Sequence, residues 1–469
     1  MRRFVVVFLM LASLAAGAAA ASSEEISMDY GRFGRMTVYR AVKQPAQVVL
    51  FVSGDGGWNL GVVDMARSLA DLGALVVGID ITVYSKNLKE SKADCIYPAA
   101  DFESLSKFVQ KKLDFPEYRI PVLVGYSSGA TMVYAVMIQA PYNTFQGAIS
   151  LGFCPDLLLH PTMCKRNGLD WKPGPKGEMI FQPFSGLSKP WIAFQGDVDQ
   201  VCSPTGTAAF VKQVKNGRLI SLPHVGHGFS VQKNWLPQFK KVFAELTAAE
   251  SGATGKMTSD GALNDLPLVE VPATSTGSNV LAVLLTGDGG WAGIDQDVSR
   301  VLAGRGVSVV GLSTLKYFWT PRTPEGAAKD LERILRYYMP LWKKDRVLLI
   351  GYSLGADILP FMASRLPEEL IAKTALIVLL GLDGDTNFEF HLSDWLGGSG
   401  EKGLPTLPEV AKLSGIPLLC LYGKEDPECV CSKIHQTAAT SVALPGSHHF
   451  GGNYPALTGE IMKALEGRK

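Results

Sequence analysis

Two serines of this chain lie in the pattern Gly-x-Ser-x-Gly. Ser127 lies in "VLVGYSSGAT" and Ser353 in "LLIGYSLGAD". Each follows an apolar run and precedes a segment with helical spacing, so the glycines permit a tight strand-to-helix turn that exposes the serine Oγ. A serine hydroxyl is a weak nucleophile, and it needs a base that is itself held by an acid. The pattern therefore indicates acyl transfer if a carboxylate and a histidine follow.

The segment after Ser353 supplies both partners in the chain order serine, acid, histidine. Asp426 in "LYGKEDPE" is the expected acid, with Glu425 as the alternative. "LPGSHHFGG" then offers two histidines. We favour His448 as the base because aligning the two copies on the following phenylalanine places it opposite the histidine of the first copy. His449 is the alternative. An exposed turn histidine without a role is the competing interpretation.

The first half carries the same three residue types in the same order. They are Ser127, Asp199 in "FQGDVDQ" and His227 in "VGHGF", and Asp197 is the alternative acid. These three residues form a second candidate site, and the second half of the chain is the one that we expect to carry catalysis.

Acyl transfer also needs donors for the oxyanion. One should be the backbone N–H of Leu354, directly after the nucleophile. The other should come from the loop "TGDGGW", where Gly289 and Gly290 let backbone N–H groups approach the substrate. A plain Asp-Gly turn is the alternative. The recurrence of this loop in both halves favours a function.

Acidic residues near Ser353 could hold a cationic substrate group. Asp357 lies four residues after the serine, and Asp288 and Asp295 could assist. The alternative for Asp357 is a favourable interaction with the helix dipole, and the sequence leaves the two open.

Cationic residues occur in "LKYFWTPRTPEG", which follows another strand end. Lys316 and Arg322 could line an entrance for an anionic, partly apolar molecule such as a lipid headgroup. Equally, the segment could pack as a loop; we favour a place at the mouth of the site.

These landmarks recur because the domain recurs. "VVLFVSGDGGWN" returns as "AVLLTGDGGWAG", and all four landmarks repeat in order at an offset of about 220–235 residues, far beyond the period of a solenoid. Short apolar runs alternate with helical segments, which predicts an α/β fold: two tandem domains, each with a mostly parallel sheet covered by helices. We expect domains at 22–249 and 279–469, joined by an Ala/Gly/Ser-rich linker at 250–278.

Composition and the N-terminus bear on location and partners. The formal net charge of +1 gives no case for a nucleic-acid partner. Residues 1–21 have two arginines, an apolar stretch and an alanine-rich end, which is typical of a cleaved secretory signal peptide. Export permits disulfides, with Cys154 and Cys164 a plausible pair among seven cysteines. Cys429 and Cys431 have no second ligand cluster at zinc spacing, so no metal is expected.

The chain resembles the VirJ/AcvB family of bacterial periplasmic virulence proteins. The resemblance rests on the secretory start, "TGDGGW", "YFWTPRTPE", "GYSLGADILPF", "LYGKEDPECVC" and "GSHHFGGNY", and is closest from about Val280 onward. The two-domain length is similar to AcvB, and VirJ corresponds mainly to the second half.

The resemblance implies a periplasmic α/β-hydrolase that cleaves the lysyl ester of lysyl-phosphatidylglycerol, an aminoacylated membrane lipid, without metal or organic cofactor. It places the lipase motif on Gly351, Ser353 and Gly355, with Asp426 and His448 as acid and base. It also implies a link to type IV secretion. Two alternatives remain: a carboxylesterase of another substrate, and a hydrolase fold kept as a non-catalytic scaffold for secretion substrates.

Overall fold

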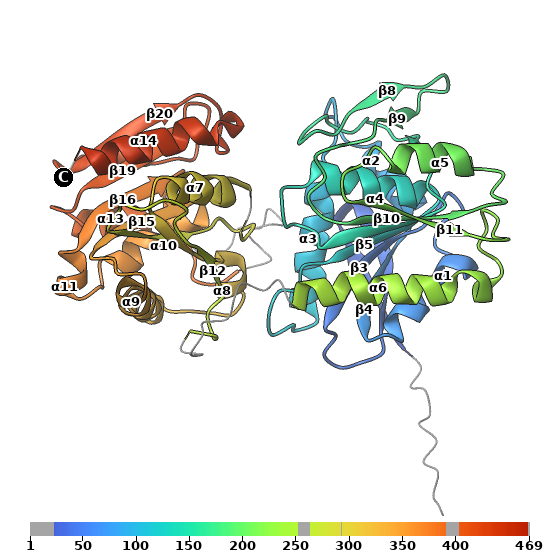
Figure 1. The fold of residues 1–469 in the computed structure, drawn as a ribbon, viewed down its shortest axis with the longest axis horizontal. Helices are drawn as coiled ribbons and strands as arrows, with labels where there is room; N and C mark the ends of the chain where they lie inside the picture. The colour runs from blue at the N-terminus through green and yellow to red at the C-terminus, as the bar shows by residue number, and fades with distance from the viewer. Residues whose placement is uncertain (1–22, 252–262, 292, 391–402, 468–469) are drawn as a thin grey trace, which may run out of the picture.

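The computed structural model describes residues 23–251, 263–291, 293–390 and 403–467. The predicted signal peptide and part of the predicted linker lie outside these residues. The described chain forms two α/β domains, which lie side by side in Figure 1. No helix among the described residues is both long and apolar enough to span a bilayer.

The first domain is built on an eight-stranded sheet in the order β1-β2-β4-β3-β5-β6-β10-β11. Within this sheet, β4, β3, β5, β6, β10 and β11 pair in parallel, whereas β1 and β2 form an antiparallel edge. The bounds are β1 Glu24–Tyr30, β2 Gly34–Arg40, β3 Gln47–Val52, β4 Ala74–Ile79, β5 Val122–Tyr126, β6 Gly147–Leu151, β10 Trp191–Gly196 and β11 Gly217–Leu222. Its helices are α1 Leu60–Ala70, α2 Ile81–Leu88, α3 Pro98–Lys112, α4 Ser128–Gln139, α5 Pro204–Val211 and α6 Leu236–Ser251.

The second domain repeats this plan with seven strands in the order β12-β14-β13-β15-β16-β19-β20. Only β12 is antiparallel to its neighbour. The bounds are β12 Leu268–Val271, β13 Val280–Leu285, β14 Ser308–Leu312, β15 Arg346–Tyr352, β16 Thr374–Leu380, β19 Leu418–Gly423 and β20 Ala439–Leu444. Its helices are α7 Gly293–Gly304, α8 Thr314–Tyr317, α9 Pro324–Leu341, α10 Leu354–Ala363, α11 Glu368–Ile371, α13 Thr406–Lys412 and α14 Tyr454–Glu466.

Each sheet has a hydrophobic core on both faces, which explains the continuous apolar runs in the sequence. In β4 and β13, for example, every residue is buried. Small strands lie outside these sheets: β7 Asp156–Leu157, β8 Trp171–Pro173 and β9 Met179–Phe181 form one sheet, and β17 Asp385–Thr386 pairs with β18 Leu404–Pro405. The predicted fold class, two tandem mostly parallel α/β domains, is confirmed.

The disulfide pairing differs from the prediction. Cys164 is bonded to Cys95, and Cys154 is bonded to Cys202. The proposed Cys154–Cys164 pair is therefore wrong, because closeness in sequence does not bring the two sulfurs together across the folded loop. In the second domain Cys420 pairs with Cys431, and Cys429 keeps a free thiol.

Candidate active sites in the two domains

Both serines occupy a strained turn between a strand and a helix. Ser127 has φ 56° and ψ −121° between β5 and α4, and Ser353 has φ 51° and ψ −124° between β15 and α10. Positive φ is uncommon for a residue with a Cβ and marks a position that the surrounding structure imposes. A Cβ at Gly129 would overlap the backbone oxygen of Ser53, and one at Gly355 that of Leu285. The flanking glycines are therefore required by close backbone approach.

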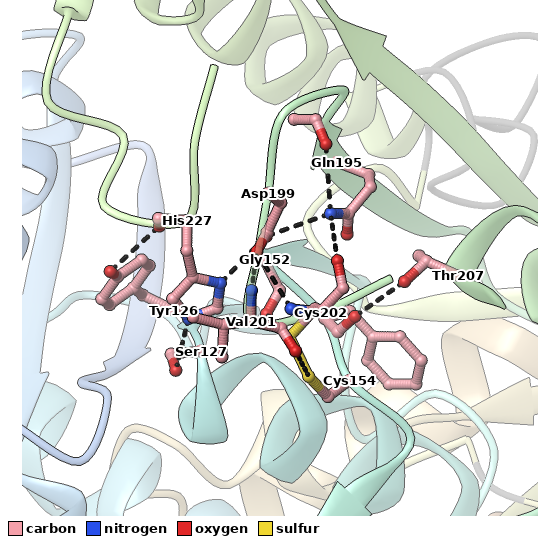
Figure 2. A network of polar contacts seen from close by, with 12 residues as sticks. Tyr126, Ser127, Gly152, Cys154, Gln195, Asp199, Val201, Cys202, Thr207 and His227 are labelled. Carbon is pink, nitrogen blue, oxygen red and sulfur yellow. Dashed lines mark hydrogen bonds and ion pairs between the residues drawn. A yellow bond between two sulfur atoms is a disulfide. The ribbon is translucent and has the colours of Figure 1, made fainter. Parts of the chain in front are cut away.

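The first domain holds a complete serine, histidine and aspartate chain of hydrogen bonds (Figure 2). His227 Nε2 lies 2.9 Å from Ser127 Oγ, and His227 Nδ1 lies 2.9 Å from Asp199 Oδ2. The three residues come from the carboxyl ends of different strands, as expected for a parallel sheet. The geometry is that of a serine nucleophile with its base and orienting acid in contact.

The acid of this site is firmly held. Asp199 Oδ1 accepts hydrogen bonds from the N–H of Val201 at 2.8 Å and of Cys202 at 2.9 Å, and Oδ2 also accepts one from Gln195 Nε2 at 3.0 Å. Burial by itself would raise the pKa of Asp199, but the hydrogen bonds from Cys202, His227 and Val201 outweigh burial and lower that pKa. Asp199 is therefore ionised and acts as an acceptor at neutral pH.

In the second domain the acid and the base are in contact, but among the described residues the contact between the base and the serine is missing. His448 Nδ1 lies 2.8 Å from Asp426 Oδ2. Within the described part of the chain, His448 and Ser353 form no hydrogen bond. His449 instead places its Nδ1 2.7 Å from the hydroxyl of Tyr352, and burial lowers the pKa of His449. Of the two predicted histidines, the structure thus brings His448 to the acid and keeps His449 away from it.

Two glycines that the sequence analysis did not single out make room for the histidine rings. Gly152 and Gly381 follow equivalent strands, β6 and β16, and both have φ +66°. A Cβ would lie 3.1 Å from His227 Cε1 at Gly152, and 2.9 Å from His448 Cε1 at Gly381. The two histidines therefore occupy matching positions. The repeated glycine after the apolar runs "AISL" and "IVLL" was the only sequence signal for this feature.

The predicted oxyanion loop forms a tight turn in both domains. The N–H of Gly290 donates to Gly287 O at 3.0 Å, as Gly57 donates to Gly54 O at 2.9 Å. This bond commits the Gly290 N–H to the turn, so the prediction that it serves the oxyanion is wrong. The Gly289 N–H has no acceptor among the described residues and remains a candidate. The N–H of Leu354 also remains a candidate oxyanion donor, because the first N–H groups of a helix have no partner within the helix.

Asp357, which we predicted could hold a cationic group of the substrate, is buried, and its side chain instead binds a backbone N–H. Its Oδ1 accepts the N–H of Asp383 at 2.7 Å, and burial raises the pKa of Asp357 well above its usual range. Its counterpart Thr131 also bonds a backbone group, the carbonyl of Cys154, at 2.5 Å. Both side chains tie the first turn of the helix to the loop after the next strand. This placement fits a structural role better than contact with a cation.

The predicted entrance residues lie in another place. Lys316 and Arg322 line a cavity of about 910 Å³ between the two domains, together with Gly289 and Gly290. Among the described residues that line it, neither Ser353 nor His448 is present. The Arg322 guanidinium stacks 4.6 Å from the Tyr317 ring centroid. The structure therefore does not bring these two cations to the nucleophile. Asp288 lies in the oxyanion loop, and Asp295 is buried in α7.

One group of described residues has ligand atoms close enough together for a metal ion: Asp199, Cys202 and His227. However, the Cys202 sulfur is bonded to Cys154, and the other two residues already pair with each other. This group fits a hydrolase triad better than a metal centre.

A strand-to-helix serine turn on a mostly parallel sheet, with histidine and acid on later loops, defines each half as an α/β-hydrolase domain. The chain belongs to the VirJ family of bacterial virulence proteins, whose model matches residues 46–151 and 279–469. No curated protein matches the chain.

Solved structures of similar fold each cover about half of the chain. The esterase domain of a Rhodothermus marinus protein has 17% identity and a TM-score of 0.34, and covers 48% of this chain and 98% of its own. Est1E from Butyrivibrio proteoclasticus has 17% identity and a TM-score of 0.33, covering 48% and 99%. An esterase from Pyrobaculum calidifontis has 18% identity and a TM-score of 0.35, covering 49% and 85%.

Proposed function

We propose that this protein is a serine esterase that works through an acyl-enzyme, with Ser127 as an assembled nucleophile and Ser353 as a second one. The observation that carries the proposal is the unbroken chain of hydrogen bonds from Ser127 through His227 to Asp199. A scaffold has no need of a serine in a strained turn that is hydrogen-bonded to an oriented base.

The chemistry follows from the atoms in place. His227 Nε2 takes the proton as Ser127 Oγ attacks the ester carbonyl, and the tetrahedral oxyanion is stabilised by backbone N–H groups of the elbow and the Gly-rich loop. Collapse breaks the ester bond, and His227 returns the proton to the leaving alcohol. A water molecule, deprotonated by the same histidine, then hydrolyses the acyl-serine.

The second site has the same parts in a more open arrangement. In free enzymes, catalytic hydrogen bonds are often long and tighten only with substrate bound. We therefore keep Ser353, with Asp426 and His448, as a catalytic group, and His448 must approach Ser353 during the reaction.

For the substrate we propose the lysyl ester of lysyl-phosphatidylglycerol, as the family resemblance implies. Attack on this ester releases phosphatidylglycerol and leaves lysine on the serine. Asp55 and Asp288, at equivalent positions of the two Gly-rich loops, supply carboxylates suited to a cationic amino acid. We place the protein in the periplasm, acting at the membrane surface, since three disulfides suit an oxidising compartment.

The test is lysine release from vesicles of phosphatidylglycerol that contain lysyl-phosphatidylglycerol. Wild type is compared with Ser127→Ala, Ser353→Ala and the double variant, and p-nitrophenyl acetate serves as a general ester. We expect release by wild type, a reduced rate in each single variant and none in the double variant. Cleavage of p-nitrophenyl acetate alone would retain the esterase and reject the lipid. Inactivity on both esters would reject the esterase and favour the scaffold alternative.

A further inference from the structure

The two Gly-rich loops are held in place in different ways. In the first domain, Asp80 Oδ2 accepts the N–H of Trp58 at 3.0 Å, so a carboxylate of the same domain fixes the end of the loop. The equivalent position in the second domain, directly after β14, is Ser313. Among the described residues, the N–H of Trp291 has no side-chain acceptor. The second loop therefore lacks this carboxylate contact, and its own domain holds it instead at the start, where Thr314 Oγ1 donates to the carbonyl of Gly287 at 2.5 Å.

A further contact to the second loop comes from the other domain. Lys107 in α3 of the first domain donates a hydrogen bond from Nζ to the carbonyl oxygen of Asp288 at 3.4 Å. The Lys107 side chain is only 1% exposed and forms an ion pair with Glu103 at 2.8 Å. It also lies 5.5 Å from the centroid of the Phe390 ring. A buried ammonium is costly unless it is paired, so this placement is imposed by the surrounding structure.

The same face of α3 and the segment after it make further contacts between the domains. Lys111, one turn after Lys107, donates to the carbonyl of Trp319 at 2.6 Å and pairs with Glu389 at 3.5 Å. Trp319 in turn donates from Nε1 to the carbonyl of Phe115 at 2.8 Å. Lys107 and Lys111 lie one turn apart on the same side of α3, and Phe115 lies three residues after the end of this helix. Trp319 is 2% exposed and belongs to an apolar cluster with residues of both domains: Tyr118, Ile120, Leu315 and Phe390.

The position of the Lys107 contact connects it to the chemistry. The carbonyl of Asp288 and the N–H of Gly289 belong to one peptide unit, which is planar and trans, so fixing one fixes the direction of the other. Among the described residues, the N–H groups of Asp288 and Gly289 both have no acceptor in the turn, and the Gly289 N–H is the one in the peptide unit that Lys107 contacts. A donor that is preorganised toward developing charge contributes strongly to the rate, and loss of one such donor costs about 10²–10³-fold in kcat.

We propose that Lys107 is a positioning residue for the Ser353 site: helix α3 of the first domain holds the Asp288–Gly289 peptide so that Gly289 can stabilise the oxyanion in the second. The duplicated domain thus serves the second site as well as carrying its own triad. This inference rests on the proposed esterase function of Ser353.

The test uses the full chain in a Ser127→Ala background, so that the remaining esterase activity belongs to Ser353. Lys107→Met keeps the length of the side chain but removes its donor, and Lys107→Arg restores a donor. Lys112→Met, on an exposed residue of the same helix, is the matched control. We expect Lys107→Met to lower kcat about tenfold or more with little change in KM, Lys107→Arg to recover part of it, and Lys112→Met to match the background.

A second measurement does not depend on activity. Amide hydrogen exchange over residues 287–291 should be faster in Lys107→Met than in Lys112→Met, since the loop loses its external support. If Ser127→Ala shows no esterase activity, the proposed function of Ser353 is wrong, and faster exchange in Lys107→Met would still support the role of Lys107 in holding the loop. Unchanged exchange together with unchanged kcat would overturn the inference, as would a loss of kcat fully explained by a lower melting temperature.

Discussion

Replacement of Asp199 by asparagine should disable the Ser127 site through the histidine tautomer. Asp199 Oδ1 accepts two backbone N–H groups, from Val201 and Cys202, so the carbonyl oxygen of an asparagine must take that place. Its amide nitrogen then faces His227 Nδ1, which lies 2.9 Å from Oδ2 in the wild type. An amide donor there forces Nδ1 to accept, and the ring proton moves to Nε2. Nε2 can then no longer take the proton of Ser127.

The expected loss is large. The equivalent change in a serine protease lowers kcat by about 10⁴-fold, which corresponds to about 5.4 kcal/mol of transition-state free energy. The hydrogen bond from Gln195 Nε2 to Oδ2, 3.0 Å long, also becomes a contact between two donors, which costs about 1–3 kcal/mol of stability.

The assay is steady-state hydrolysis of p-nitrophenyl acetate in a Ser353→Ala background, so that only the first site is read. Asp197→Asn is the matched control, because Asp197 is exposed and accepts the N–H of His224 rather than the base. We expect the control to keep its kcat. A folded Asp199→Asn protein that loses less than tenfold in kcat would refute the tautomer argument.

Three further outcomes follow from the structure. Burial raises the pKa of Asp357 well above its usual range, so the folded state binds this proton more tightly than the unfolded state, and stability falls as pH rises above the unfolded pKa. Asp357→Asn should therefore raise the melting temperature at pH 8 but not at pH 4, and a lower melting temperature at pH 8 would contradict this. Replacing both Cys154 and Cys202 by serine should lower the kcat of the Ser127 site more than that of the Ser353 site, because the N–H of Cys202 holds the acid Asp199. Each kcat is measured in the variant whose other serine is replaced by alanine, and equal losses would argue against a local effect. Gly152→Ala adds a Cβ about 3.1 Å from His227 Cε1 at a position with φ +66°, and should lower the kcat of the first site at least tenfold; an unchanged kcat would show that the ring has room.

Much of the fold and the site chemistry was accessible from sequence because it depends on local pattern. Apolar runs alternating with helical segments gave the parallel sheets, and the glycines around Ser127 and Ser353 gave the turns. The order of serine, acid and histidine placed Asp199 and Asp426 at strand ends, where the structure has them beside His227 and His448.

The remaining features depend on how distant segments meet. Nothing in the local sequence indicates that Ser127 is hydrogen-bonded to its histidine while Ser353, among the described residues, is not. The partners of Cys154 and Cys164 lie 48 and 69 residues away. Trp319 lies in a segment that we expected at the mouth of a site, yet it packs between the domains, because an aromatic residue after a strand end suits either place.

The most direct test of the central claim is labelling with a fluorophosphonate, which reacts with an activated serine. The adduct on the full chain would be measured by intact mass and located by peptide mapping, in wild type, Ser127→Ala, Ser353→Ala and the double variant. We predict an adduct on Ser127 in the wild type, slower labelling in Ser127→Ala, and none in the double variant. A folded wild-type protein that forms no adduct at Ser127 would contradict the claim that its triad is ready for catalysis.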